Sequence, residues 1–123
     1  MHTFSFDRIY PPESSQEEVY DTTAKSAVMS ILEGYNSTIL AYGQTGTGKT
    51  YTMEGFKFNC GDPQRGIIPR SMEEIFKFIE NASNSQTTFM VRASYLQIYM
   101  EVISDLLRPE RTNLNIREDK RKG

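Results

Sequence analysis

The segment from residue 43 to residue 50 constrains the fold of this chain more than any other. It reads Gly43-Gln44-Thr45-Gly46-Thr47-Gly48-Lys49-Thr50. The segment fits the pattern G-x-x-x-x-G-K-[ST], in which glycines allow positive φ angles and the backbone N–H groups turn inward around an anion. The sequence therefore predicts a phosphate-binding loop, which we call the phosphate loop.

The residues on either side of the phosphate loop support this prediction. The run from Ser37 to Tyr42 is short, apolar and partly β-branched, which is typical of a buried parallel strand. A helix that begins at Lys49 would complete the strand, loop and helix arrangement that the motif requires. In that arrangement Lys49 places its charge on the β- and γ-phosphates, and the Thr50 hydroxyl ligates Mg²⁺.

The bulk properties of the chain exclude several classes of function. The 123 residues suffice for one domain, and the net charge of −2 argues against a nucleic-acid binder. The single cysteine, Cys60, lies in a polar loop and cannot form an internal disulfide or a zinc cluster. The start of the chain has no signal-peptide layout, and no apolar run is long enough to cross a bilayer. We therefore expect a soluble, intracellular protein with no membrane contact.

Hydrophobic periodicity and turn residues predict the remaining elements. Ser14 or Ser15 has the spacing to Glu17 and Glu18 that caps a helix in a capping box. The patterns predict helices over 16–33, from 49 and from 69, a helical turn over 101–107, and strands over 3–10, 38–42, 87–100 and 114–117. An irregular insertion is expected over 54–65 and a polar turn over 81–86. The alternation of strands and helices predicts an α/β layered fold with a mostly parallel sheet.

Several stretches together resemble the kinesin motor domain, in the order and with the spacing of that family. They are residues 6–10, 19–20, 39–55, 65–70, 94–101 and 105–107. The form Tyr-Gly-Gln-Thr-Gly-x-Gly-Lys-Thr, present here as residues 42–50, is far more specific than a generic phosphate loop. The resemblance implies a P-loop NTPase-type fold with a central, mostly parallel β-sheet flanked by helices.

The resemblance also implies ligands and a partner. Residues Gly43, Gln44, Thr45, Gly46, Thr47, Gly48, Lys49 and Thr50 would cradle the phosphates of ATP, with Mg²⁺ on Thr50. Tyr51 falls where such motors carry an aromatic residue or His near the adenine, although an aromatic there is equally compatible with core packing. The partner of the complete motor would be the microtubule, which places the protein in the cytoplasm on the cytoskeleton. The resemblance leaves the subfamily, direction of movement, cargo and oligomeric state open.

Two further regions depart from the family pattern or have two interpretations. The family often shows Glu-Ile-Tyr-Asn-Glu where this chain has Gln97-Ile98-Tyr99-Met100-Glu101, a change expected to affect packing and not phosphate contacts. The basic residues toward the end of the chain would approach an acidic tubulin surface, or would simply form a solvated segment. These residues are Arg111, Arg117, Lys120, Arg121 and Lys122.

The sequence lacks two segments that such motors need for hydrolysis. Neither Asn-x-x-Ser-Ser-Arg-Ser-His, which senses the γ-phosphate, nor Asp-Leu-Ala-Gly-x-Glu, which lies near Mg²⁺, occurs among the 123 residues. We therefore expect residues 1–123 to form the front part of a motor domain that binds nucleotide without turning it over, and no catalytic residue is assigned.

Two alternatives are compatible with parts of this pattern. A small nucleotide kinase would place its phosphate loop after the first strand and carry an arginine-rich lid, and neither feature is present. A non-hydrolysing module that binds nucleotide and microtubules fits the absence of the two segments well. A steady-state ATPase assay with and without microtubules separates that module from a motor.

Overall fold

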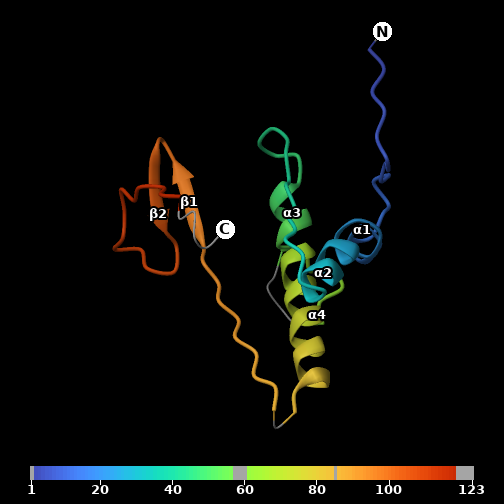
Figure 1. Cartoon of the computed structure of the whole chain (residues 1–123). Coiled ribbons are helices and arrows are strands. Elements are labelled where there is room, and N and C mark those ends of the chain that lie inside the picture. The colour runs from blue at the N-terminus through green and yellow to red at the C-terminus, as the bar shows by residue number, and fades with distance from the viewer. Residues whose placement is uncertain (1, 57–60, 85, 119–123) are drawn as a thin grey trace. The chain divides into compact units, whose positions relative to one another are not determined.

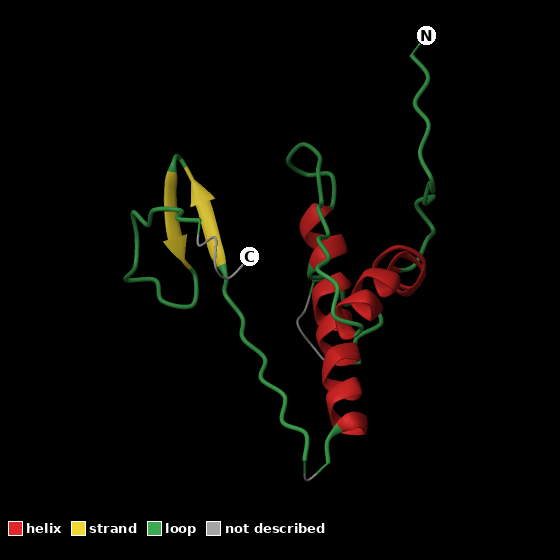
Figure 2. Ribbon diagram, viewed as in Figure 1, coloured by secondary structure: helices red, strands yellow, loops and turns green. Residues whose placement is uncertain are grey.

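The computed structural model describes residues 2–56, 61–84 and 86–118. The chain divides into two compact units, Met1–Thr87 and Thr88–Gly123, which are described separately (Figure 1). The first unit is helical and contains the phosphate loop, whereas the second contains a β-hairpin (Figure 2). Cys60 and the basic residues Lys120, Arg121 and Lys122 lie outside the described residues.

The predicted helix over 16–33 is confirmed, with a widened turn in its middle. It consists of α1 (Gln16–Val19), the π-helical turn η1 (Tyr20–Ala24) and α2 (Lys25–Leu32). The Ser15 hydroxyl accepts a hydrogen bond from the Glu18 N–H at 3.1 Å, which makes Ser15 the capping residue. Within the wide turn, the Thr22 hydroxyl donates to the Glu18 carbonyl at 2.6 Å, a side-chain bond that commonly accompanies a distorted helix.

The helices predicted from residues 49 and 69 are also present. The short helix α3 (Lys49–Met53) follows the phosphate loop, and α4 (Ile67–Ala82) begins two residues before the predicted start at Pro69. Proline is tolerated in a first helical turn because that turn needs no N–H donor. Since α4 continues through Ala82, the polar turn predicted over 81–86 starts later than expected. A bridge between Asn84 and Thr87 follows the helix.

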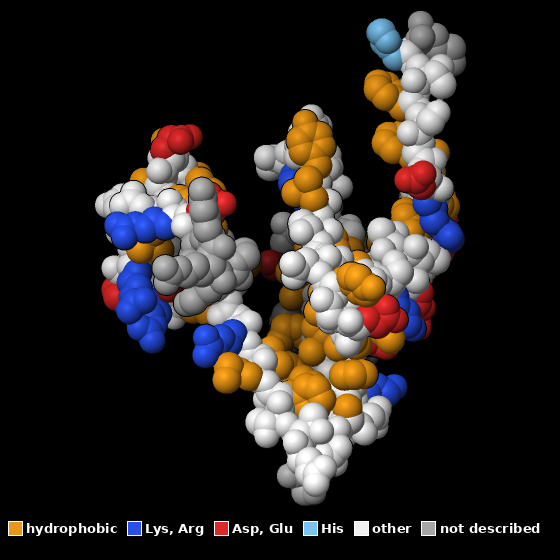
Figure 3. Space-filling view, in the orientation of Figure 1, with side chains coloured by type: hydrophobic (Ala, Val, Ile, Leu, Met, Phe, Trp, Pro, Cys, Tyr) orange, Lys and Arg blue, Asp and Glu red, His pale blue; other side chains and the backbone are white. Residues whose placement is uncertain are grey.

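One apolar stripe of the first helical segment forms the centre of the core. Tyr20, Ala24 and Val28 follow one another at four-residue spacing and are buried together with Ile67 of α4. The side chains of Ile39, Met53 and Ile75 pack against this cluster and are partly buried. Figure 3 shows hydrophobic side chains gathered over the helices of this unit.

The strands predicted over 3–10 and 38–42 do not form within the described residues. In the second segment Ile39 packs against the core, but Leu40 and Tyr42 are 84% and 96% exposed. A strand exists only when its N–H and C=O groups pair with a neighbour, and neither segment has such a partner among the described residues. The prediction of strands over these two segments is therefore wrong for the described residues, because the apolar pattern does not supply the pairing.

The second unit corrects the prediction of a helical turn over 101–107. Strand β1 (Leu96–Tyr99) pairs antiparallel with β2 (Val102–Asp105), with Tyr99 opposite Val102. The two residues that join the strands, Met100 and Glu101, have φ angles of 48° and 63°, the left-handed values of a tight hairpin turn. Neither residue is a usual hairpin-turn residue, which is why the sequence pattern missed this turn.

The other two strand predictions in this unit are confirmed in part or not at all. Of the strand predicted over 87–100, only β1 forms. The strand predicted over 114–117 is absent from the described residues, although the Leu114 N–H donates to the Ile103 carbonyl at 3.0 Å. No helix in the described part of the chain combines the length and the apolar character needed to span a bilayer.

Candidate nucleotide-binding site

The phosphate loop depends on three glycines, and for two different reasons. Gly46 and Gly48 have φ angles of 83° and 92°, which residues with side chains rarely adopt, and a Cβ at either would meet nothing within 4 Å. Gly43 has a φ angle of 155°, and a Cβ there would lie 2.8 Å from the Thr47 hydroxyl oxygen. The loop therefore needs glycine at residues 46 and 48 because of their backbone conformation. At residue 43 it needs glycine both for the backbone conformation and because a Cβ would be too close to Thr47.

The Lys49 ammonium group lies inside the turn of the phosphate loop. Its Nζ donates to the carbonyl oxygens of Gly43 at 2.8 Å and Gln44 at 2.6 Å. The Thr47 hydroxyl also donates to the Gln44 carbonyl, at 2.8 Å. A positive charge is thus held at the centre of a glycine-rich loop, where main-chain and side-chain donors can face an anion.

A surface hollow of about 440 Å³ adjoins the loop. Its volume falls within the range of sites that hold small molecules and cofactors. The hollow is lined by Ala41, Tyr42, Gly43, Thr47, Gly48, Lys49 and Thr52. The structure thus brings the first glycine of the motif, its lysine and the extended segment before the loop to one cavity.

The remaining predicted residues, Gln44, Thr45, Thr50 and Tyr51, lie in the loop and at the start of α3. Gln44, Thr45 and Thr50 are exposed. The Tyr51 ring packs against Phe56, with ring centroids 4.9 Å apart and planes inclined by 46°. Among the described residues, no group of three or more His, Cys, Asp and Glu side chains is placed to hold a metal ion.

The predicted basic surface is described only in part. Arg111 and Arg117 are both exposed, as either interpretation of this segment requires. The backbone of Arg111 is held in place, because its carbonyl accepts from the Asp105 N–H at 3.0 Å and its N–H donates to the Arg108 carbonyl at 2.9 Å.

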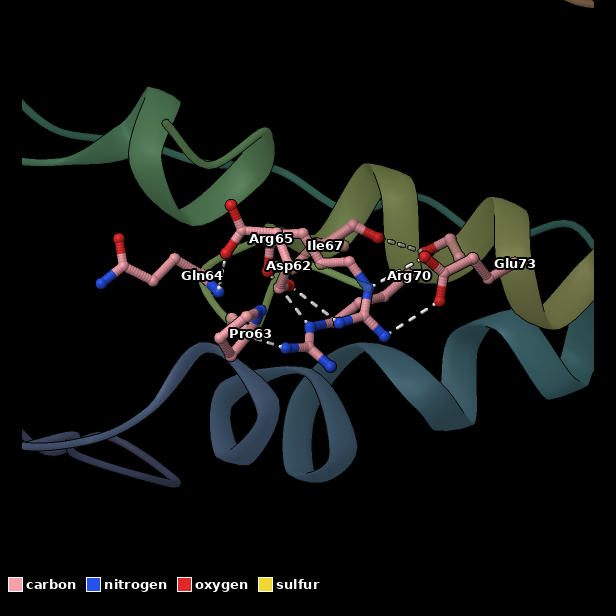
Figure 4. Close-up of polar contacts among 8 residues, drawn as sticks. Asp62, Pro63, Gln64, Arg65, Ile67, Arg70 and Glu73 are labelled. Atoms are coloured by element: carbon pink, nitrogen blue, oxygen red, sulfur yellow. Dashed lines mark hydrogen bonds and ion pairs between the residues drawn. The ribbon is translucent and has the colours of Figure 1, made fainter. Parts of the chain in front are cut away.

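The sequence did not identify a second polar centre, which lies where the insertion loop (residues 54–65) returns to the helices (Figure 4). Arg70 of α4 is only 7% exposed and donates to the main-chain carbonyls of Arg65 at 3.1 Å and Pro63 at 2.9 Å. Arg65 in turn pairs with Glu73, with its Nε 2.9 Å from one carboxylate oxygen and its Nη2 2.9 Å from the other. The acidic and basic residues of this segment indicate that ion pairs could form. The sequence spacing does not predict which residues pair, because Arg65 and Glu73 are eight positions apart and Arg70 binds main-chain carbonyls.

Two glycines allow the backbone segments on either side of the insertion loop to approach each other closely. A Cβ on Gly55 would lie 2.5 Å from the Gln64 carbonyl oxygen, and one on Gly66 would lie 2.5 Å from the carbonyl carbon of Met53. The Gly66 N–H donates to the Glu54 carbonyl at 3.1 Å. The two described ends of the insertion loop therefore meet directly at the end of α3.

Comparisons with known proteins place the chain in a family. The family model for the kinesin motor domain matches residues 1–123. Kinesin-related protein 3 of Dictyostelium discoideum is 49% identical over 123 residues, which cover 99% of this chain and 10% of that protein. The human Kinesin-1 heavy chain is 47% identical over 118 residues, covering 95% of this chain and 12% of that protein. The chain belongs to the kinesin motor domain family.

Solved structures agree with this assignment. A structure described as a fast kinesin superposes with a TM-score of 0.87 at 46% identity, covering 98% of this chain and 33% of that one. The Drosophila family member Kin10/NOD, solved with divalent manganese and ADP, gives a TM-score of 0.76 at 37% identity and covers 88% and 38%. The predicted class of P-loop NTPase fold is confirmed. The chain spans about a tenth of the curated relatives and about a third of these solved chains.

Proposed function

We propose that residues 1–123 are part of a kinesin motor domain and that the phosphate loop binds the phosphates of ATP. The carrying observation is the position of the Lys49 ammonium group, which lies between two carbonyls inside a loop kept open by glycines. A lysine at this point of a glycine-rich loop supplies the charge that a triphosphate needs. The motor that contains this segment would couple ATP hydrolysis to movement along microtubules.

Each residue of the loop has a physical role in this proposal. The backbone N–H groups from Gly43 to Gly48 face the phosphate oxygens, and Lys49 leaves its loop carbonyls to pair with the β- and γ-phosphates. Replacing two neutral acceptors by an anionic one strengthens the hydrogen bonds of the ammonium group. Binding therefore exchanges contacts internal to the loop for contacts with the ligand.

Two further residues are proposed to contact the Mg²⁺ ion and the adenine ring of the nucleotide. Mg²⁺ binds reluctantly to all-protein cages and is commonly held by one or two side chains together with phosphate oxygens. The exposed Thr50 hydroxyl fits that role, and the manganese and ADP in the Kin10/NOD structure support a divalent ion at this kind of site. Tyr51, whose ring packs at a tilt against Phe56, would offer an aromatic surface beside the adenine.

Hydrolysis depends on groups that these residues do not include. The Asn-x-x-Ser-Ser-Arg-Ser-His and Asp-Leu-Ala-Gly-x-Glu segments do not occur in the sequence. A motor that contains this segment would draw its γ-phosphate sensor and its acidic Mg²⁺ partner from elsewhere. The 123 residues alone are proposed to bind nucleotide and not to turn it over.

Membership of the kinesin motor domain family supports a partner and a cellular location for this protein. The similar structure of a fast kinesin is described as having implications for interactions with microtubules, which supports tubulin as the partner here. Exposed Arg111 and Arg117 are then candidates to approach an acidic surface. The protein would act in the cytoplasm, on the microtubule cytoskeleton.

The test combines a binding measurement with a turnover measurement. Titration of the chain with fluorescent ADP in the presence of Mg²⁺ is expected to show saturable binding that weakens when Mg²⁺ is chelated. Phosphate release from ATP is expected to stay at background with and without microtubules. Absence of saturable binding would refute the proposed site. Microtubule-stimulated turnover would refute the proposal that the 123 residues bind nucleotide without hydrolysing it.

A further inference from the structure

A buried side chain joins the phosphate-loop helix to two other parts of the fold. Gln16, the first residue of α1, is only 6% exposed. Its Nε2 donates to the Tyr51 carbonyl at 2.6 Å and to the Gln64 carbonyl at 3.2 Å. One amide group therefore ties α1 to α3 and to the returning end of the insertion loop.

The bond to Tyr51 satisfies a need created by the shortness of α3. A helix leaves its last four carbonyls without partners in the helix, and α3 has five residues in total. The Gly55 N–H, which would reach Tyr51 in a longer helix, donates instead to the Thr50 carbonyl at 3.3 Å. Gln16 supplies the Tyr51 carbonyl with a donor from outside the helix.

The anchored carbonyl lies next to the residues that the proposed function uses. Tyr51 directly follows Thr50, the proposed Mg²⁺ ligand, and α3 begins at Lys49. The Lys49 ammonium group and the Thr50 hydroxyl can meet a phosphate group and its metal together only if the backbone that carries them is fixed. Gln16 fixes that backbone through its bond to the Tyr51 carbonyl.

We propose that Gln16 is a positioning residue for nucleotide binding. It touches no ligand, and it acts through the Tyr51 carbonyl by holding the first turn of α3 in one orientation. The bond to Gln64 sets the same amide against the insertion loop, so the side chain cannot rotate away without losing two acceptors. This inference rests on the proposed function of the phosphate loop.

The sharpest substitution removes the donor and keeps the shape. Gln16→Glu replaces the amide by a carboxylate that only accepts, so both carbonyls lose their donor and face a negative oxygen. Gln64→Glu is the matched control, because Gln64 is exposed and contributes its main-chain carbonyl to Gln16. Gln16→Lys restores a donor of similar reach and serves as the rescue variant.

Calorimetric titration with ADP and Mg²⁺ separates positioning from folding. A positioning role predicts that Gln16→Glu raises the Kd about tenfold at an unchanged number of sites, with Gln64→Glu within twofold of the parent. Gln16→Lys is expected to recover most of the affinity. A loss of sites at an unchanged Kd, as a purely structural role would give, would overturn the inference.

The same titration separates failure of the inference from failure of the proposed site. If the parent chain binds ADP and Gln16→Glu binds equally well, the positioning role is wrong and the phosphate loop stands. If the parent chain binds no ADP, both are wrong. If Gln64→Glu weakens binding as much as Gln16→Glu, a negative charge near the insertion loop and not the lost donor lowers the affinity, and the inference is also overturned.

Discussion

The two loops on either side of α3 differ in what holds their shape. The phosphate loop is mostly exposed, and its bonds join residues three to six positions apart, such as Lys49 to Gly43. The returning end of the insertion loop, residues 61–65, also has local bonds through Asp62, but buried polar groups from α1 and α4 hold it in addition, with Gln16 reaching a carbonyl 48 positions away. The bonds of the phosphate loop are local, whereas those of this returning end include partners from distant parts of the first unit.

This difference has a consequence for ligand binding. Local bonds to Lys49 can be exchanged for bonds to an anion without disturbing the core. The contacts of the insertion loop involve buried groups, whose loss leaves polar atoms without partners. Substitutions in the phosphate loop should therefore affect binding, and substitutions at the return of the insertion loop should affect stability.

The largest effect on stability is expected where the backbone crosses itself. Gly66→Ala would place a Cβ 2.5 Å from the Met53 carbonyl carbon, in a chain segment that cannot yield easily, and should cost about 3 kcal/mol of unfolding free energy. Gly46→Ala in the phosphate loop meets open space and should cost only about 1 kcal/mol, from its positive φ angle. Urea unfolding followed by circular dichroism measures both, and equal losses would break the comparison.

The next effect is expected at Arg70. Arg70→Met removes the donor from the Arg65 and Pro63 carbonyls, and should lower the free energy of unfolding by about 2 kcal/mol. Lys77→Met, at an exposed position of the same helix, is the control and should change it by less than about 0.5 kcal/mol. Chemical denaturation decides the matter, and a similar loss in both variants would remove Arg70 from the account.

A smaller effect is expected for the ion pair between Arg65 and Glu73. Their side chains are 18% and 36% exposed, so Glu73→Gln should cost about 1 kcal/mol at low salt. The difference from the parent should shrink as salt rises, because partly exposed charges are screened. Glu80→Gln, on the exposed surface of α4, is the control. A loss that does not depend on salt would indicate packing and not charge.

The smallest effect concerns Tyr20, which lines a hollow of about 290 Å³ beside Arg70 and Glu74. Burial raises the pKa of the Tyr20 phenol above its usual value, and the Glu74 carboxylate adds to the shift. The folded state then holds this proton more tightly than the unfolded state, so stability is full below pH 10 and falls as the pH rises further. Tyr20→Phe should lose less stability than the parent as the pH rises from about 9 to about 11, as thermal unfolding would measure. Identical alkaline profiles would contradict the shift.

The sequence predicted what short-range chemistry determines. The glycine spacing predicted a turn with positive φ angles at residues 43, 46 and 48, which the structure has, while its binding of phosphate stays a prediction. The capping serines with the apolar stripe predicted the helix from Gln16 onward, and Ser15, one of the two candidates, caps it. The kinesin family was also identified correctly from its motifs. In each case residues close in sequence carry the information.

The features that the sequence predicted wrongly or missed depend on residues that are far apart in sequence. The hairpin turn at Met100 and Glu101 forms because two strands pair, and neither residue favours it locally. The strands expected over 3–10 and 38–42 depend on neighbours that residue patterns do not specify. The sequence places Gln16 only at a helix start, because the fold and not the local sequence brings its two acceptors to it.

In the proposed function, the phosphate loop holds a nucleotide through Lys49. Calorimetric titration of the chain and of Lys49→Ala with ADP and Mg²⁺ tests this role of the lysine. The parent is expected to give a saturable binding isotherm and the variant no binding heat, because the variant keeps the glycine turn but lacks its positive charge. Equal affinity of the two proteins for ADP would show that the Lys49 charge does not hold the nucleotide.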